Sequence, residues 1–171
     1  MTVSSAARIT PERIVQGLKD ARIDFITSLA QDDISDVLRL LDQQQEIAHV
    51  HLCREEEGFG ICAGAYLGGK NPAILLHNTG FLASANAITS LNLANQFPLL
   101  MLVSYSGYFG EQNPWSAGPG ETTESTLNAL GIRYWILRDA AEVCSVLIAA
   151  HQLMHASKRP VAVLLPPLIW A

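Results

Sequence analysis

Three consecutive glutamates, Glu55, Glu56 and Glu57, stand between a short apolar segment and a segment with helical spacing. In open parallel sheets, ligands bind at the carboxyl ends of the strands, so a carboxylate that follows a strand lies where chemistry is usually done. Acids are also common at helix N-termini because the helix dipole stabilises them. The preceding Arg54 can pair with one glutamate and leave another free, so the triplet remains a candidate for a catalytic carboxylate.

A second polar turn follows the next apolar segment and reads His77, Asn78, Thr79, Gly80. Parallel strands end at one edge of a sheet, so this turn is expected near the glutamates. A histidine at a strand end is more commonly a hydrogen-bonded structural residue than a catalyst, and both interpretations stay open.

The remaining histidines do not predict a metal site. His49 and His51 alternate within a strand and share one face, but the sequence shows no third ligand beside them. His151 and His155 are four residues apart on a helix and lack a third ligand as well. The three cysteines have no C-x-x-C spacing, so neither a zinc nor an iron–sulfur site is expected.

The segment behind the glutamates carries Gly60, Gly64 and Gly68 on one helical face. Each glycine costs roughly 1 kcal/mol relative to alanine inside a helix, so the close approach of another backbone is the simplest explanation. No charged residue occurs in residues 71–110. Both features predict a large subunit interface.

Strand-like and helix-like segments alternate along the chain. The expected strands are residues 24–28, 47–52, 72–77, 98–104, 133–137 and 160–165. The expected helices are residues 11–21, 33–42, the glutamate-led helix, 82–94, 122–130 and 140–157. This alternation predicts an α/β three-layer sandwich, with a parallel sheet of about six strands and helices on both faces.

Composition narrows the class of protein. At 171 residues the chain is expected to form one domain, from residue 11 onward, behind an N-terminal tail of residues 1–10. The net charge of −5 argues against nucleic acid as a partner. The strongest apolar run, residues 97–103, is too short to cross a membrane. No secretory signal is recognisable, and the few cysteines fit a reducing compartment, so a cytoplasmic location is expected.

Several of these segments together resemble the pyrimidine-binding domain of thiamine-diphosphate-dependent enzymes, and most closely the sulfopyruvate and phosphonopyruvate decarboxylases. The similar segments are residues 54–66, 70–75, 78–80, 86–87 with 90–92, 104–105 with 107, and 127–134. The resemblance extends over nearly the whole chain after residue 10. It implies the thiamine-diphosphate-binding fold for residues 11–171.

The resemblance also implies roles for particular residues. Counting ten residues back from Tyr66, as the family spacing requires, gives Glu56 as the acid that activates the cofactor. Such a carboxyl group shares a proton with ring nitrogen N1′ of the aminopyrimidine. Other implied cofactor contacts are Ser28, His77, Asn78, Thr79 and Gly80. Weaker candidates for the substrate pocket are Tyr105, Ser106 and Leu82, and residues 105–121 form a candidate lid.

A missing motif points to a partner. Relatives of this kind hold Mg²⁺ and the diphosphate through a Gly-Asp-Gly…Asn motif, and this sequence contains no Gly-Asp-Gly. The resemblance therefore implies a separate beta subunit, in a homo- or hetero-oligomer, that supplies this half of the site. The expected activity is decarboxylation of a small 2-oxo acid to CO₂ and an aldehyde. Carboligation by the same cofactor and a non-catalytic flavodoxin-like regulatory module remain the alternatives.

Two departures from the family concern the substrate. The sulfopyruvate and phosphonopyruvate enzymes resemble Ser-Tyr-Arg-Gly where this chain has Ser106 in place of the arginine. An arginine fork suits a sulfonate or phosphonate, and a serine cannot replace its charge. The family turn also resembles Asn-Ser-Gly-Leu-Gly-Asn, where this chain has Leu82 and Ala83 in place of Gly-Asn. Both differences favour a less charged 2-oxo acid.

Overall fold

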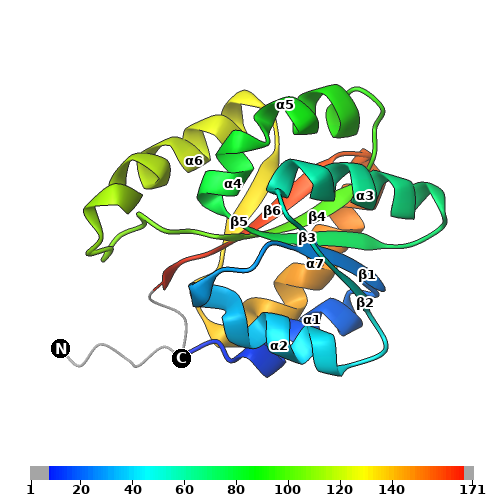
Figure 1. Ribbon diagram of the computed structural model, residues 1–171, viewed down its shortest axis with the longest axis horizontal. Helices are drawn as coiled ribbons and strands as arrows, with labels where there is room; N and C mark the ends of the chain where they lie inside the picture. Colours follow the sequence, from blue (N-terminus) through cyan, green and yellow to red (C-terminus); the bar gives the residue numbers. More distant parts are fainter. Residues whose placement is uncertain (1–7, 168–171) are drawn as a thin grey trace.

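The computed structural model describes residues 8–167, which form a six-stranded sheet between two layers of helices (Figure 1). The strands are β1 (Phe25–Ser28), β2 (Ala48–His51), β3 (Pro72–His77), β4 (Leu99–Ser104), β5 (Arg133–Ile136) and β6 (Pro160–Leu165). They lie in the order β2-β1-β3-β4-β6-β5, and every pairing is parallel. The predicted fold class is confirmed.

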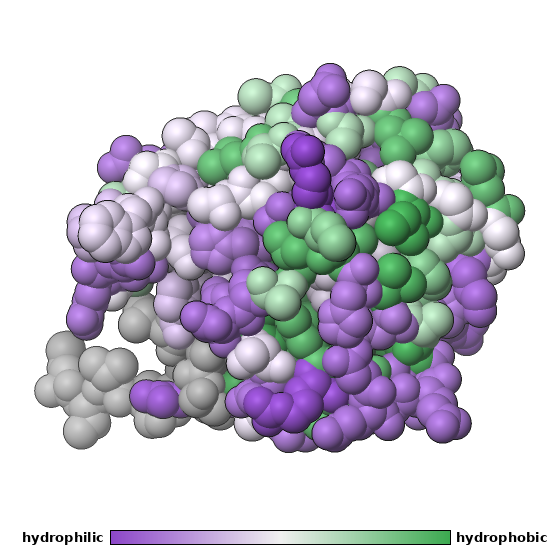
Figure 2. All heavy atoms as spheres, in the orientation of Figure 1, coloured by the Kyte–Doolittle hydropathy of each residue, from purple (hydrophilic) through white to green (hydrophobic). Residues whose placement is uncertain are grey.

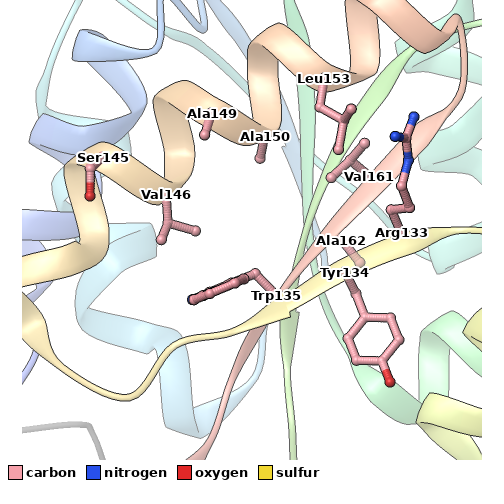
Figure 3. A pocket seen from close by; sticks show the side chains of 10 residues that line it. All are labelled: Arg133, Tyr134, Trp135, Ser145, Val146, Ala149, Ala150, Leu153, Val161 and Ala162. Carbon is pink, nitrogen blue, oxygen red and sulfur yellow. The ribbon is translucent and has the colours of Figure 1, made fainter.

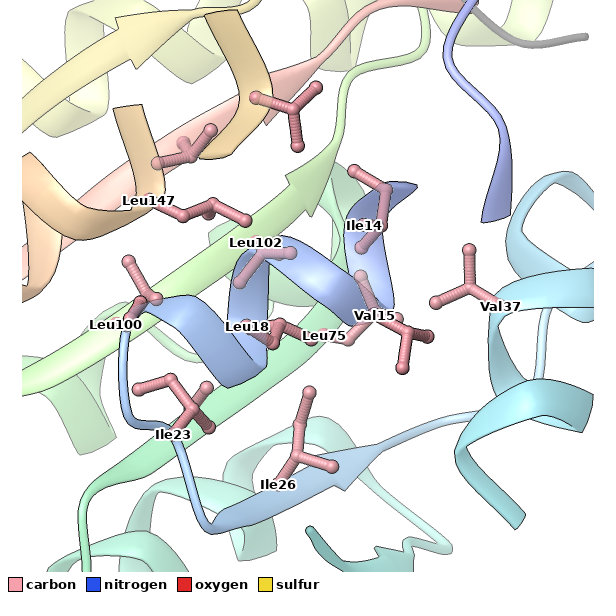
Figure 4. Close-up of a cluster of buried hydrophobic side chains, with 14 of the residues drawn as sticks. Ile14, Val15, Leu18, Ile23, Ile26, Val37, Leu75, Leu100, Leu102 and Leu147 are labelled. Carbon is pink, nitrogen blue, oxygen red and sulfur yellow. The ribbon is translucent and has the colours of Figure 1, made fainter. Parts of the chain in front are cut away.

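One face of the sheet is covered by α1 (Pro11–Asp20), α2 (Ser35–Gln43) and α7 (Val143–Ser157), which lie below the sheet in Figure 1. Helix α1 begins as the sequence predicts, because Thr10 caps it and Pro11 occupies its first turn. Figure 4 shows the core that joins these helices to the sheet, with Leu18 and Leu147 pointing toward strand residues such as Leu75 and Leu102. The short η1 (Asp32–Ile34) and η4 (Ala140–Glu142) lead into α2 and α7.

The other face carries α3 (Glu55–Leu67), α4 (Asn78–Ala83), α5 (Ala85–Ala87), η2 (Ile88–Leu93) and α6 (Ala117–Ala129). Side chains of the central strands alternate between the two layers. Leu75 and Leu102 pack toward α1 and α7, whereas Leu76 and Val103 pack toward α3 and α4. Strands β3, β4 and β6 are therefore buried on both faces, as uncharged strands of a parallel sheet should be.

Two helices differ from their predicted boundaries. The helix predicted at residues 82–94 is divided into the end of α4, α5 and a π-helical segment. The hydroxyls of Thr89 and Ser90 in the π-helical segment donate to carbonyls one turn earlier. Helix α6 starts five residues before the predicted residue 122. Pro119 fits there because the first turn of a helix leaves its N–H groups without intrahelical partners.

Part of the predicted N-terminal tail packs into the core. Ile9 lies in the predicted tail of residues 1–10, yet its side chain is fully buried against the α1 and α2 layer. None of the helices within residues 8–167 is long and apolar enough to cross a membrane.

The glycine face of α3 points outward. An added Cβ at Gly60 or Gly64 would meet no other atom within 4 Å, so within residues 8–167 no second backbone packs against this face. Ile61 and Leu67 of the same helix are exposed. Figure 2 shows apolar side chains gathered over the region where α3 lies in Figure 1.

Candidate active site

A hollow of about 560 Å³ lies at the carboxyl ends of β1 and β3. The chain order reverses between these strands, because β2 lies on one side of β1 and β3 on the other. Such a switch point is where open α/β sheets bind ligands. The hollow is lined by Gln31, Asp32, Asp33, His77, Thr79, Ser106, Glu111, Asn113, Trp115, Ser116 and Pro167.

Both ring nitrogens of His77 make hydrogen bonds. Its Nδ1 accepts the backbone N–H of Thr79 at 3.2 Å and so caps α4, and the same Nδ1 lies 2.8 Å from the Thr79 hydroxyl. Its Nε2 lies 2.8 Å from Oγ of Ser106. Because Nδ1 is the acceptor, Nε2 carries the proton and donates it to Ser106. The structure therefore brings together three predicted residues, His77, Thr79 and Ser106, at the wall of the hollow.

Asn78 is fully buried beneath this wall and does not line it. Its Nδ2 donates to the Ser106 carbonyl at 2.8 Å and to the Thr123 hydroxyl at 3.1 Å. Its Oδ1 is buried and meets no hydrogen-bond partner within the described chain. These bonds tie the turn after β3 to the loop after β4 and to α6, so Asn78 positions Ser106.

The three glutamates at the start of α3 have different surroundings. Glu56 pairs with Arg54, whose Nη2 lies 3.0 Å from its Oε2, and both side chains are partly or largely exposed. Glu55 lies instead over Gly80 in α4, where an added Cβ would be 2.5 Å from the Glu55 carboxyl carbon. Glu57 is exposed. Glu55, which the ten-residue spacing does not select, is thus the glutamate next to the turn after β3.

The absence of a Cβ at position 80 was the signal in the sequence that could have pointed to Glu55. Gly80 was expected to contact the cofactor. In the structure it leaves room for a carboxylate from the neighbouring helix.

Six of the nine predicted residues do not line the hollow, namely Glu56, Asn78 and Gly80, described above, and Ser28, Tyr105 and Leu82. Ser28 is fully buried, and its hydroxyl lies 2.7 Å from Nε2 of His49. Tyr105 is also buried and donates to Glu124 at 2.9 Å, and burial together with this carboxylate raises the pKa of its phenol. Leu82 packs against the core on the α3 side. Strand alternation and the turn of α4 direct these side chains into the protein, so their predicted pocket roles are not supported by their placement.

The loop after β4 is held in shape by Glu111. Its carboxylate accepts the backbone N–H groups of Gly107, Gln112 and Asn113 at 2.9–3.0 Å. The bonds to Gly107 and Asn113 lower the pKa of Glu111. Gly107 has a left-handed φ of 81°, and an added Cβ would overlap Gly120. The loop lines the hollow as expected for a lid, and Trp115 stands at its rim with 79% of its surface exposed.

The lining of the hollow is acidic. It contains Asp32, Asp33 and Glu111, and among residues 8–167 no lysine or arginine contributes to it. The hydroxyl of Ser104, the last residue of β4, donates to Asp33 and fixes that carboxylate. The sequence did not indicate Asp33, because Asp33 lies in η1 after β1, far along the chain from Ser104.

A second hollow of about 410 Å³ lies at the opposite edge of the sheet (Figure 3). It lies between α7 and strands β5 and β6, with Trp135, Val146 and Leu153 around it. It is mainly apolar and contains none of the predicted site residues.

Comparisons with known proteins show the family of this chain. Residues 10–117 match the family described as "Thiamine pyrophosphate enzyme, N-terminal TPP binding domain". The sulfopyruvate decarboxylase subunit alpha of Methanocaldococcus jannaschii is 38% identical over 92% of this chain and 93% of the relative. The corresponding subunit of Methanococcus maripaludis is 34% identical over 93% of this chain and 95% of the relative.

Two longer proteins are also similar. A sulfopyruvate decarboxylase of Methanosarcina acetivorans is 31% identical over 93% of this chain, which spans 40% of that protein. A 2-oxoglutarate:ferredoxin oxidoreductase from Magnetococcus marinus has the same fold over 94% of this chain and 29% of its own, with a TM-score of 0.70 and 14% identity. The chain therefore belongs to the family of N-terminal TPP-binding domains of thiamine pyrophosphate enzymes, among relatives named as alpha subunits of sulfopyruvate decarboxylase.

Proposed function

We propose that this chain is the alpha subunit of a two-subunit, thiamine-diphosphate-dependent decarboxylase that acts on a small 2-oxo acid. The observation that supports this most directly is a carboxylate beside the turn after β3, at the switch point of a sheet that belongs to a thiamine pyrophosphate enzyme family. Thiamine diphosphate, when bound, supplies the electron sink that decarboxylation of a 2-oxo acid needs.

The residues present fit the pyrimidine half of this cofactor. A glutamate at the start of α3 would hold a proton at N1′ of the pyrimidine. His77 and Thr79 line the hollow, and the loop of residues 105–121 would exclude water from it. Glu55 adjoins the same turn at Gly80 and is not itself a lining residue.

We assign the proton-sharing role to Glu55 rather than to Glu56, which the ten-residue spacing favours. The Glu56 carboxylate is already paired with Arg54, so sharing a proton with a ring nitrogen would require it to leave that cation. Glu55 lies against Gly80, a position that has no side chain, and is the glutamate that faces the turn after β3.

Glutamine variants separate these two assignments in the complex of this chain with its partner. Glu55→Gln should reduce CO₂ release by about a hundredfold or more, as loss of a proton-transfer group does. Glu56→Gln should cost less than about tenfold, and Glu57→Gln is the matched control at an exposed position. A loss confined to Glu56→Gln would restore the assignment from spacing. Full turnover in both variants would refute the proposed function.

The second subunit would supply the Mg²⁺ and diphosphate site. The relatives of similar length are named as alpha subunits, and the longer Methanosarcina protein has room for more than this domain. The exposed face of α3 offers a contact surface, because Gly60 and Gly64 allow close backbone approach and Leu67 has 71% of its surface exposed. Leu67→Glu should weaken co-purification with the product of the adjacent gene, while exposed Thr122→Glu on α6 should not.

The substrate is proposed to carry less negative charge than sulfopyruvate. Two like charges 4 Å apart repel by about 4 kcal/mol at an effective dielectric constant of 20, and the hollow already contains three acidic side chains. Ser106 offers a hydroxyl where the related decarboxylases resemble Ser-Tyr-Arg-Gly. A comparison of kcat/KM for sulfopyruvate and for 2-oxo acids with apolar side chains tests this, and a clear preference for sulfopyruvate contradicts it.

Product analysis in the same assay distinguishes decarboxylation from carboligation, since only the latter joins two carbon chains. The complex is expected to work in the cytoplasm, where its free cysteines would remain reduced. The flavodoxin-like regulatory interpretation is not supported by the family match.

A further inference from the structure

Two histidines that the sequence left without a third ligand meet a carboxylate in the structure. His49 and His51 lie on the edge strand β2, and Asp42 lies in the last turn of α2, beside that strand (Figure 1). Oδ1 of Asp42 is 2.7 Å from Nδ1 of His49 and 2.9 Å from Nε2 of His51. One donor atom from each of the three residues lies within 4.8 Å of the other two.

We propose that Asp42, His49 and His51 form a site for a divalent transition-metal ion of the zinc class. Two imidazole nitrogens and one carboxylate oxygen are the ligands that Zn²⁺ takes when a fourth position is left to water. The alternation of residues along β2 places both histidines on one face, and α2 supplies the third ligand. This site is separate from the proposed cofactor site at the turn after β3.

The most buried ligand is oriented by a second contact. His49 has 3% of its side chain exposed, and its Nε2 lies 2.7 Å from the buried hydroxyl of Ser28. A metal-binding histidine commonly uses its second nitrogen in this way, because the contact fixes the ring and its tautomer. Ser28, expected to contact the cofactor, is thus placed to position His49.

The two other ligands leave the site open to ions from solution. The side chains of His51 and Asp42 are 55% and 48% exposed.

The second histidine pair provides a matched comparison. His151 and His155 also stack on one helix face, with ring centroids 4.6 Å apart. Among the described residues, no carboxylate lies with them in a three-ligand group. If two histidines were enough to bind the ion, both pairs should bind it. If three ligands are needed, only the pair beside Asp42 should bind it.

The experiment titrates Zn²⁺ into the full chain, purified with any subunit that accompanies it and freed of metal with a chelator. Saturating Mg²⁺ and thiamine diphosphate are present throughout, so that a diphosphate site is already filled. Isothermal titration calorimetry should give one Zn²⁺ per chain. His51→Ala and Asp42→Asn should each weaken binding at least tenfold, whereas His155→Ala should leave it unchanged.

Stability provides a readout that does not depend on activity. A Zn²⁺ concentration one hundred times the dissociation constant should raise the Tm of the wild-type chain by about 5–10 °C. The same Zn²⁺ concentration is about ten times the dissociation constant of a variant whose binding is tenfold weaker, so the Tm of His51→Ala should rise by no more than about 3–6 °C. His51 is exposed, so its replacement should not prevent folding, and Asp42→Asn keeps the side-chain shape.

Three results would overturn the proposal. These are the absence of stoichiometric Zn²⁺ binding, equal binding by wild type, His51→Ala and Asp42→Asn, and loss of binding in His155→Ala alone. Any of them would leave Asp42, His49 and His51 as a hydrogen-bonded cluster that anchors α2 to β2.

Discussion

Replacing Gly80 by alanine should test whether the Glu55 side chain occupies the turn after β3. The added Cβ would lie 2.5 Å from the Glu55 carboxyl carbon, so either the glutamate or α4 must move. Overpacking of this kind costs about 1–3 kcal/mol in the free energy of unfolding. The substitution also gains about 1 kcal/mol from the higher helix propensity of alanine. The net expected change is a loss of about 0–2 kcal/mol.

A double-mutant cycle isolates the contact from the propensity gain. In a Glu55→Ala background the overlap is gone, so Gly80→Ala should become stabilising by about 1 kcal/mol. The coupling energy between the two positions should then be about 1–3 kcal/mol. Thermal unfolding of the complex measures this, because 1 kcal/mol corresponds to about 2–4 °C in Tm for a domain of this size.

Activity provides the second half of the test. Gly80→Ala should lower kcat for CO₂ release, because it displaces the carboxylate proposed to share a proton with the cofactor. The control is Thr122→Ala, at an exposed position on α6 outside the candidate site and the proposed contact surface on α3. If Gly80→Ala changed the Tm equally in the wild-type and the Glu55→Ala backgrounds, the placement of Glu55 would be refuted.

Three further predictions concern groups with perturbed surroundings. Tyr105→Phe should cost about 1–3 kcal/mol in the free energy of unfolding, because it leaves the Glu124 carboxylate with one fewer donor, and thermal unfolding measures the loss. The lowered pKa of Glu111 means that its contribution to loop order is complete above its ordinary pKa of 4.5 and is lost as the pH falls through the lower folded value. Hydrogen exchange of the loop amides should show this dependence in wild type and not in Glu111→Gln. Burial raises the pKa of Cys62 to about 12, so a thiol reagent at neutral pH should modify exposed Cys53 and reach Cys62 only after unfolding, as mass spectrometry of the labelled peptides would show.

Several features of the fold were predictable because they depend on local order along the chain. The alternation of strand-like and helix-like segments was sufficient for an all-parallel sheet with two helical layers. The run of apolar residues in β4 is typical of a strand buried on both faces of a parallel sheet, and all six of its residues are buried. The apolar residues Val143, Leu147, Ala150 and Met154 share one side of α7 and are all buried.

Other helix boundaries depended on side-chain hydrogen bonds and on the position of a proline, which hydrophobic periodicity does not report. Hydroxyl groups of Thr89 and Ser90 bond to preceding carbonyls and accompany a π-helical turn in the predicted helix. Pro119 reads as a helix breaker in isolation, but it is tolerated in the first turn of α6.

Within the candidate site, the sequence alone identified the strand ends, the residue types and the turn at His77 and Thr79. It could not rank Glu55 against Glu56, because the choice depends on a contact with Gly80 that is 25 positions away along the chain. The sequence also could not show that Asp42 lies next to His49 and His51, because this depends on how α2 packs beside β2. Side-chain types and their periodicity can be read from the order of residues. The distance between two carboxylates or two ligands is set only when the helical layers pack against the sheet.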